Sequence, residues 1–89
     1  MIKQVLLDLS KFKSIAEIHS FLSKELGFED YYGYNLDALY DSLSTLFTKT
    51  SIEIINFNQI NGVYKKDVER MLNVFDDVAE ESEYFNYTF

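Results

Sequence analysis

The chain has 89 residues, of which 47% are hydrophobic, and it contains neither cysteine nor proline. This composition suits one domain over residues 1–89, is too apolar for a disordered chain, and excludes disulfides and thiolate metal sites. Fifteen acidic residues against eight basic ones give a net charge of -7, so the surface is expected to repel nucleic acid and anionic membranes and to attract a basic partner.

The amino-terminal segment, MIKQVLLDLSKF, does not resemble an export signal. It carries an acidic residue among its apolar ones and lacks the small-residue cleavage site of a signal peptide. No apolar run in the chain is long enough to cross a bilayer. The sequence therefore predicts a cytoplasmic protein without a membrane segment.

The first predicted elements are a strand and a helix. Residues 2–9 are almost continuously apolar, as in a buried parallel strand. Ser14 and Glu17 form a capping box, S-x-x-E, ahead of apolar residues at helical spacing. Gly27 is a typical helix stop, so the helix is expected to end just before it.

The next predicted elements are a second helix and a short strand. Asn35 is a favourable N-cap, and leucines then recur at intervals of three and four, which predicts a helix over residues 36–47. Residues 49–51 are expected to turn the chain. The isoleucine-rich residues 52–56 predict a strand.

The last third of the chain predicts one further helix and one further strand. Residues 57–64 are irregular and include the turn signal Asn61-Gly62. Apolar residues at helical spacing predict a helix over residues 65–81, and alternating aromatic and polar residues predict a strand over residues 84–89.

The order of these elements is strand, helix, helix, strand, helix, strand. Strands separated by helices indicate an α/β fold with a parallel sheet, here of three strands packed with about three to four helices. So small a sheet is expected to be covered mainly on one face.

The second predicted helix carries acidic residues that nothing in its own segment balances. Opposite its leucine stripe lie Asp37, Tyr40, Asp41 and Ser44, with no lysine or arginine in the segment. Like charges four residues apart cost roughly 0.2–0.5 kcal/mol. The surface is either a solvated acidic face that salt screens or a face that binds a basic partner.

The last predicted helix opposes its own dipole. Lys65 and Lys66 lie near its positive end, and acidic residues gather at its negative end, at a cost of roughly 0.3–1 kcal/mol for each well-placed charge. These acidic residues are Asp76, Asp77, Glu80, Glu81 and Glu83. The same two interpretations apply to them.

The loop before the second helix contains a tyrosine pair and a glycine. Gly33 is expected to adopt a positive φ that turns the chain into the helix. Tyr31 and Tyr32 would then stand at the helix entrance, one of them partly in the core.

Catalytic and metal-binding patterns are missing. His19 lies beside the core stripe of its helix, and we expect a surface or boundary position without a catalytic role. Residues 30–41 have the length of an EF-hand loop, but Tyr32 and Tyr34 occupy ligand positions. Asp37 and Asp41 as a glycosidase pair would need a sugar cleft larger than this chain offers. No enzymatic activity, cofactor or metal is expected.

The segment YYGYNLDALYD, residues 31–41, resembles the signature of the barstar family, the intracellular inhibitors of barnase-type ribonucleases. The segments IAEIHSFLSKELGF and MLNVFDDVAEE resemble the first and last helices of that family, so the similarity extends over nearly the whole chain. The resemblance implies a compact α/β fold with a three-stranded parallel sheet. It also implies that the motif helix and the preceding loop enter the active site of a basic ribonuclease.

The resemblance further implies residue roles. Asp41 would take the place of an RNA phosphate among the basic groups of the enzyme, Asp37 would pair with a neighbouring basic group, and Tyr31 would pack on the catalytic histidine. The implied partner-binding set is Tyr31, Tyr32, Gly33, Asn35, Leu36, Asp37, Ala38, Tyr40, Asp41, Ser44, Thr45, Leu46 and Asp77.

Some positions depart from the family pattern. Tyr40 replaces the commoner tryptophan, and Thr45 and Leu46 stand where a Gly-Trp pair contributes to the interface. Tyr34 occupies a position that is often acidic. The alternative to a barnase-type target is another basic protein bound by the same fold. The acidic face argues against self-association, so the free protein is expected to be a monomer.

Overall fold

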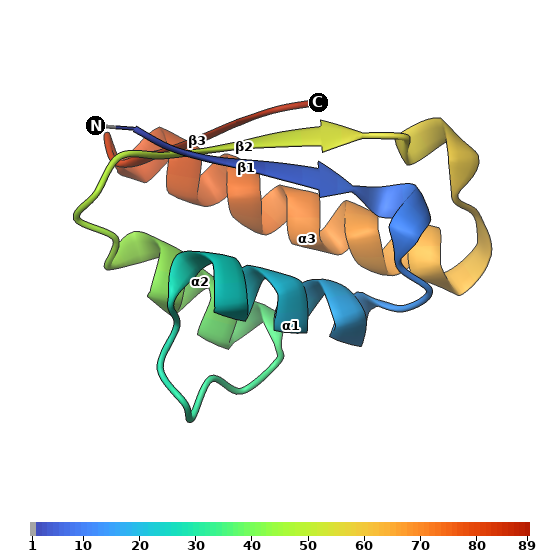
Figure 1. Ribbon diagram of the computed structural model, residues 1–89, viewed down its shortest axis with the longest axis horizontal. Helices are drawn as coiled ribbons and strands as arrows, with labels where there is room; N and C mark the ends of the chain where they lie inside the picture. Colours follow the sequence, from blue (N-terminus) through green and yellow to red (C-terminus); the bar gives the residue numbers. More distant parts are fainter. Residues whose placement is uncertain (1) are drawn as a thin grey trace.

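A computed structural model describes residues 2–89 and places three strands and three α-helices in the predicted order (Figure 1). The strands are β1 (Lys3–Asp8), β2 (Thr50–Ile55) and β3 (Phe85–Thr88). The helices are α1 (Ile15–Leu26), α2 (Leu36–Ser44) and α3 (Gly62–Glu81). Two 3-10 turns, Leu9–Lys11 and Phe57–Gln59, follow β1 and β2.

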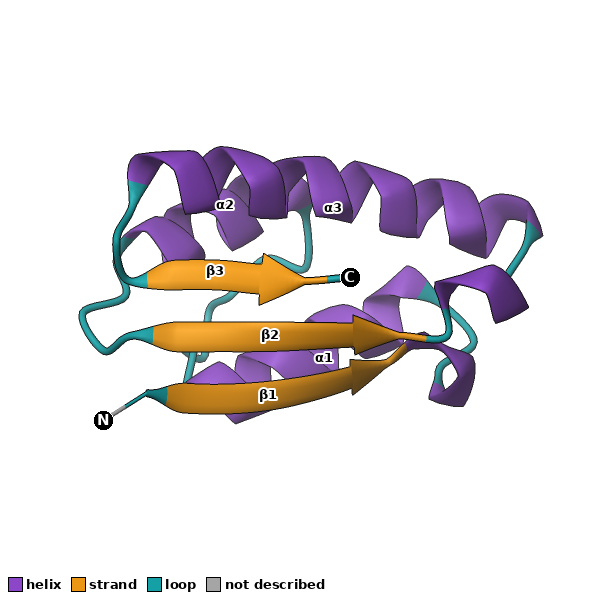
Figure 2. Cartoon of the chain, turned by 90° about the horizontal axis from the view of Figure 1, so that it is seen from above, coloured by secondary structure: helices purple, strands orange, loops and turns teal. Residues whose placement is uncertain are grey.

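The three strands form one parallel sheet in the order β1-β2-β3. Val5 pairs with Ile52, and Ile52 pairs with Tyr87 across the sheet. The helices pack on one face of this sheet, with α3 directly beneath it in Figure 1 and α1 and α2 farther away (Figures 1 and 2). The predicted α/β class, the parallel sheet and its one-sided covering are confirmed.

The hydrophobic core lies between the sheet and the helices. Phe75 of α3 is fully buried at its centre and meets Phe85 and Tyr87 of β3 edge to face, with ring centroids 5.5 Å apart in both pairs. Leu39 and Leu43 are the fully buried residues of α2. They attach that helix to the core, while the opposite side of α2 stays in solvent.

One expectation about β1, that it is buried on both faces, is wrong. The apolar run of β1 predicted a strand buried on both sides, but only Val5 and Leu7 are buried, and Leu6 is 56% exposed. The reason is that all three helices pack against the same face of the sheet. Within residues 2–89, no helix combines the length and the apolar character needed to cross a membrane.

The helix boundaries differ from the predicted ones by up to three residues. α2 ends at Ser44 rather than at residue 47 because the backbone tightens there: the Leu46 N–H donates to the Leu43 carbonyl, and the Thr45 hydroxyl donates to the Ser42 carbonyl. α3 begins at Gly62 rather than at residue 65, directly after Asn61. Pattern alone does not reveal these ends, since they depend on backbone hydrogen bonds.

The strand boundaries differ for a tertiary reason. Thr50 and Ser51 were expected in a turn but belong to β2, because the ladder with β1 begins at Thr50 and the Thr50 N–H donates to the Tyr84 carbonyl. β1 spans Lys3–Asp8 and β3 spans Phe85–Thr88, both shorter than predicted.

The caps of α1 agree with the sequence signals. The Ser14 hydroxyl accepts a hydrogen bond from the Glu17 N–H, and the Glu17 carboxylate accepts one from the Lys13 N–H, one residue before the cap. Gly27 closes the helix with a φ of 69°. The chain then leaves α1 into the loop that carries the tyrosine pair.

Candidate protein-binding site

The loop between α1 and α2, residues 27–35, projects from the end of the molecule farthest from the sheet (Figure 1). Tyr31 lies on this loop and is 84% exposed, so its ring has almost no cover within the described chain. An aromatic side chain held in this way is available for contact with a partner.

Tyr32, the other member of the pair, anchors the loop to the helices. Its ring packs against Phe28, with centroids 4.9 Å apart, and its hydroxyl is hydrogen bonded to Nδ1 of His19 at 2.6 Å. Burial, followed by the proximity of Tyr34, raises the pKa of Tyr32, so its hydroxyl stays protonated. The prediction that one of the two tyrosines belongs partly to the core is confirmed.

His19 was expected at the surface or at the core boundary, and this expectation is wrong. The side chain is only 3% exposed, because the tyrosine loop folds over it. The ring centroids of Tyr32 and Tyr34 lie 5.7 and 5.9 Å from that of His19, and the Tyr34 ring stacks on it. Burial lowers the pKa of His19 below its ordinary value of 6.5.

The buried His19 predicts a dependence of stability on pH. The unfolded chain takes up a proton near pH 6.5, whereas burial disfavours the charged ring in the folded protein, so the unfolded state binds more protons in mild acid. We expect the free energy of unfolding to fall as the pH decreases from 7 to 5, by at most about 1.4 kcal/mol per pH unit for this one proton. Urea denaturation across that range measures the slope.

The matched variant is His19→Gln, which keeps a polar side chain but removes the titration. Its slope between pH 7 and 5 should be flatter than that of the wild type. Equal slopes would show that another group, and not His19, causes the pH dependence.

The glycine of the loop has a role different from the predicted one. The left-handed backbone is found at Tyr34, with a φ of 50°, and not at Gly33. A Cβ at Gly33 would lie 3.0 Å from Nδ2 of Asn35 and 3.6 Å from Cβ of Ala38. A side chain at position 33 would therefore crowd the Asn35 side chain at the start of α2, so glycine suits this position through close packing rather than through a positive φ.

Asn35 begins α2 and ties it to the loop, as its predicted capping role required. Its Oδ1 accepts from the Ala38 N–H at 2.8 Å, and its Nδ2 donates to the Gly33 carbonyl at 3.1 Å. One side chain thus satisfies an otherwise free helix N–H and holds the loop against the helix.

Two substitutions separate these roles. Asn35→Ala removes both hydrogen bonds and should lower the free energy of unfolding by about 1 kcal/mol. Asn35→Asp keeps the capping oxygen and should stay within a few tenths of a kcal/mol of the wild type, although it can no longer donate to the Gly33 carbonyl. Thermal or urea unfolding measures both. An equal loss in the two variants would mean that the bond to Gly33, and not the cap, carries the stabilisation.

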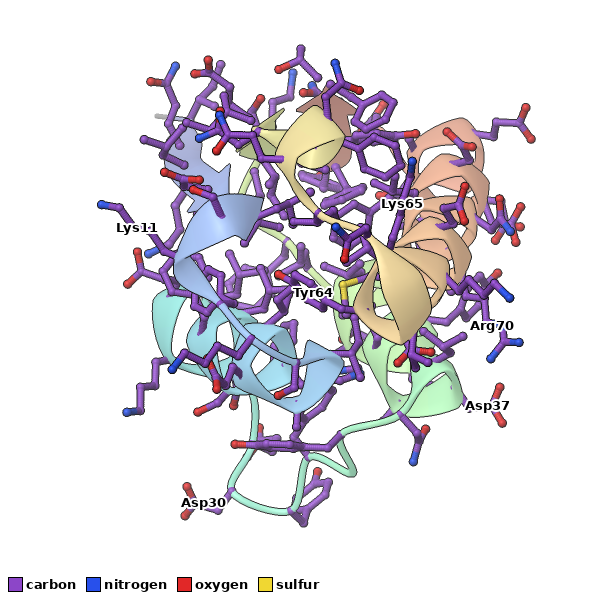
Figure 3. The ribbon with its side chains drawn as sticks, turned by 90° about the vertical axis from the view of Figure 1, so that its right-hand side faces the viewer. Lys11, Asp30, Asp37, Tyr64, Lys65 and Arg70 are labelled. Atoms are coloured by element: carbon purple, nitrogen blue, oxygen red, sulfur yellow. The ribbon has the colours of Figure 1, made fainter. Side chains whose placement is uncertain are left out.

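The acidic residues of α2 point into solvent. Asp37 and Asp41 are exposed and one helical turn apart, and Asp37 occupies the first turn, where the helix dipole favours an acid. Figure 3 shows Asp30 on the loop and Asp37 on α2 directed outward. Arg70 of α3 lies on the same side as Asp37 in that view, and its ion pair within residues 2–89 is with Asp67 at 3.8 Å.

Loop and helix enclose an open hollow of about 510 Å³, here called the acidic hollow. It is lined by Glu29, Tyr31, Tyr32, Gly33, Ala38, Asp41, Ser42 and Thr45. The structure therefore brings Asp41 and Tyr31 to one concavity, which the small residues Gly33 and Ala38 also line. Asn35 and Leu36 line no part of it; Leu36 is half-buried and packs against the core.

A second group forms where α2 meets α3. The hydroxyl of Tyr40 donates a hydrogen bond to Glu81, and this bond, with burial and the nearby charge of Asp77, raises the pKa of Tyr40. Ser44 also lies beside Tyr40. Tyr40 is thus half-buried and joins the two helices, while Asp77 extends the acidic surface from α2 onto α3.

Sequence reasoning missed three residues that lie beside the predicted set. Glu29 and Ser42 line the acidic hollow, and Phe47 stands exposed beyond the end of α2. Phe47 was included in the predicted helix but does not continue its leucine stripe. That mismatch was the only sign in the sequence that the side chain is exposed. Glu29 and Ser42 line the hollow because the loop folds against α2, and no sequence pattern predicts this arrangement.

The arrangement has the character of a binding surface. It presents exposed carboxylates, one exposed aromatic ring and small residues that allow close approach. Within residues 2–89, no three histidine, aspartate or glutamate side chains are gathered closely enough to hold a metal ion. The one histidine of the chain is buried under the loop and does not face the acidic hollow.

Comparison with known proteins identifies a family and a relative that this chain resembles. The sequence model of a family described as "Barstar (barnase inhibitor)" matches residues 2–89. A protein of Bacillus subtilis (strain 168) named "Putative ribonuclease inhibitor YrdF" is 35% identical over 83 residues, which cover 89% of this chain and 88% of that protein.

Proposed function

The chain belongs to the barstar family, and from this premise we propose that it is a ribonuclease inhibitor that occludes the active site of a basic, barnase-type ribonuclease. An inhibitor of this kind acts by binding and performs no chemistry.

The observation that carries the proposal is the position of Asp41. Asp41 is exposed on α2 and lines the acidic hollow together with Tyr31. A ribonuclease active site binds the phosphates of RNA through basic side chains and the bases through stacking. A carboxylate beside an aromatic ring presents the same two chemistries, so this surface can compete with RNA.

The surrounding charge supports fast and specific association. Asp37, Asp77 and Glu81 extend the negative surface around Asp41, and the whole chain carries a net charge of -7. Opposite potentials steer two proteins together and raise the association rate, an effect that salt weakens. Close charge pairs then gain strength where the interface excludes water.

The proposal is tested by titrating a purified barnase-type ribonuclease with the full chain at low and at physiological salt. We expect inhibition at a one-to-one ratio, with a dissociation constant that rises with salt. No inhibition at micromolar concentration would reject this target. A pull-down that returned a basic protein other than a ribonuclease through the same surface would assign the site to that partner.

Two properties of the free protein stay predictions. The acidic face predicts a monomer, because two copies would bring like charges together. A cytoplasmic location is predicted as well, because the family that the chain resembles consists of intracellular inhibitors.

A further inference from the structure

A second hollow of about 580 Å³ opens where α2 ends and the chain turns toward β2. Its apolar wall consists of Leu26 at the end of α1, Phe28 in the loop that follows, and Leu46 and Phe47 in the segment after α2. One cation, Lys3, also lines it. We call it the apolar hollow. Of its lining, Thr45 and Leu46 belong to the partner-binding set that the family resemblance implies, whereas Leu26, Phe28 and Phe47 do not.

The apolar hollow adjoins the acidic hollow, and the two together are here called the groove. Glu29, Ser42 and Thr45 line both. Thr45 follows Asp41 by four residues, which corresponds to about 6 Å along a helix. A partner that covers Asp41 therefore also reaches the edge of the apolar hollow, since a standard interface covers roughly 800 Å² on each protein.

The two most exposed large apolar side chains mark the two parts of this groove. Phe47 is 86% exposed and Tyr31 is 84% exposed, more than any other large apolar side chain of residues 2–89. A single exposed apolar residue needs no explanation. Two bulky rings on the two parts of the groove, whose shared lining includes Glu29, form the pattern of anchor residues around a charged centre.

We propose that Phe47 and the apolar hollow receive an apolar or aromatic side chain of the same ribonuclease, next to its basic active site. This inference rests on the proposed function and adds a determinant of target choice to it. Every ribonuclease of this type presents cations to the RNA phosphates, so Asp41 alone distinguishes poorly between them. Enzymes differ in whether they carry an apolar side chain at the right distance from those cations. Contact between such a side chain and Phe47 would therefore favour some ribonucleases over others.

A second copy of the chain suits the groove less well than a basic enzyme. A symmetric contact through this surface would place Asp41 and Glu29 of one copy opposite the same groove of the other. Each copy carries a net charge of -7, which opposes such an approach. A basic enzyme with an apolar rim complements both parts of the groove.

The test compares Phe47→Ser with Val63→Ser in the full chain, against a barnase-type ribonuclease that the wild type inhibits. Val63 is 76% exposed and belongs to the first turn of α3. The start of α3 and the segment that follows α2 lie at opposite ends of the molecule (Figure 1). We expect Phe47→Ser to raise the dissociation constant about tenfold or more, mainly through faster dissociation, with an unchanged salt dependence. Val63→Ser should stay within about twofold of the wild type.

Asp41→Asn is measured in the same series, so that the two proposals fail in different ways. If Asp41→Asn weakens inhibition and Phe47→Ser changes it less than about twofold, the apolar contact is rejected and the inhibitor function stands. If the wild type inhibits no ribonuclease, both proposals are rejected. Sedimentation of the free protein tests whether the groove binds a second copy of the chain. Dimers that are lost in the Phe47→Ser variant would assign the groove to self-association and reject the contact with the enzyme.

Discussion

Replacing Asp41 with alanine is expected to weaken ribonuclease inhibition more than any other single change on the surface. The carboxylate is exposed in the free protein and would be buried among cations in the complex, so its removal leaves those cations unpaired. Truncating one member of such a pair costs roughly 2–5 kcal/mol, a range to which charge pairs of this family's own complex contribute. The dissociation constant should therefore rise about thirtyfold or more, as measured by inhibition titration.

The controls separate the local charge from the overall charge. Asp41→Asn keeps the shape of the side chain, and Glu53→Gln removes one charge from the outer face of the sheet, far from the groove. Asp41→Asn should reproduce most of the loss, whereas Glu53→Gln should alter only the association rate, and only slightly at physiological salt. Equal effects of the two variants would mean that net charge, and not the position of Asp41, governs binding.

Replacing Leu39 with alanine is expected to have the largest effect on stability. Leu39 is fully buried and attaches α2 to the core, so the variant loses buried apolar surface and leaves a cavity. Such changes cost about 2–5 kcal/mol. A domain of this size is stable by only about 4–13 kcal/mol, so urea denaturation should show a much lower midpoint.

The matched control is Leu6→Ala, the same chemical change on the open face of the sheet, where Leu6 is 56% exposed. Its cost should stay within about 0.5 kcal/mol. Leu39→Ala should still inhibit in proportion to its folded fraction, and the ribonuclease should raise its midpoint because it binds the folded state. A folded Leu39→Ala variant that failed to inhibit would show that the cavity distorts the surface of α2.

Together, the two substitutions separate the opposite faces of one helix. Asp41→Ala should lower affinity and leave stability nearly unchanged, whereas Leu39→Ala should lower stability and leave the contact surface in place. The side of α2 that holds the helix to the core and the side that meets the partner are thus independent, because Leu39 is fully buried and Asp41 lies in solvent.

Much of this protein could be predicted from local patterns. The spacing of apolar residues predicted three helices and three strands, and the alternation of helices and strands predicted a parallel sheet; all of these are present. The N-cap of Asn35 and the helix stop at Gly27 were correct as well. These features depend on residues close together in the chain, so sequence alone determines them.

Tertiary contacts decided the remaining features. His19 became a core residue only because the loop with Tyr32 and Tyr34 folds over it, a contact between segments thirteen or more residues apart. The suitability of glycine at position 33 arises from its close packing against Asn35, not from the positive φ that was expected.

The candidate site shows the same division. The motif over residues 31–41 identified Tyr31 and Asp41, because a side chain's charge and ring are visible in the sequence. The groove that joins them to Phe47 exists only because the loop after α1 and the segment after α2 come together in the fold. The sequence determined which chemistry is present, and the tertiary structure decided which of these groups a single partner can contact at once.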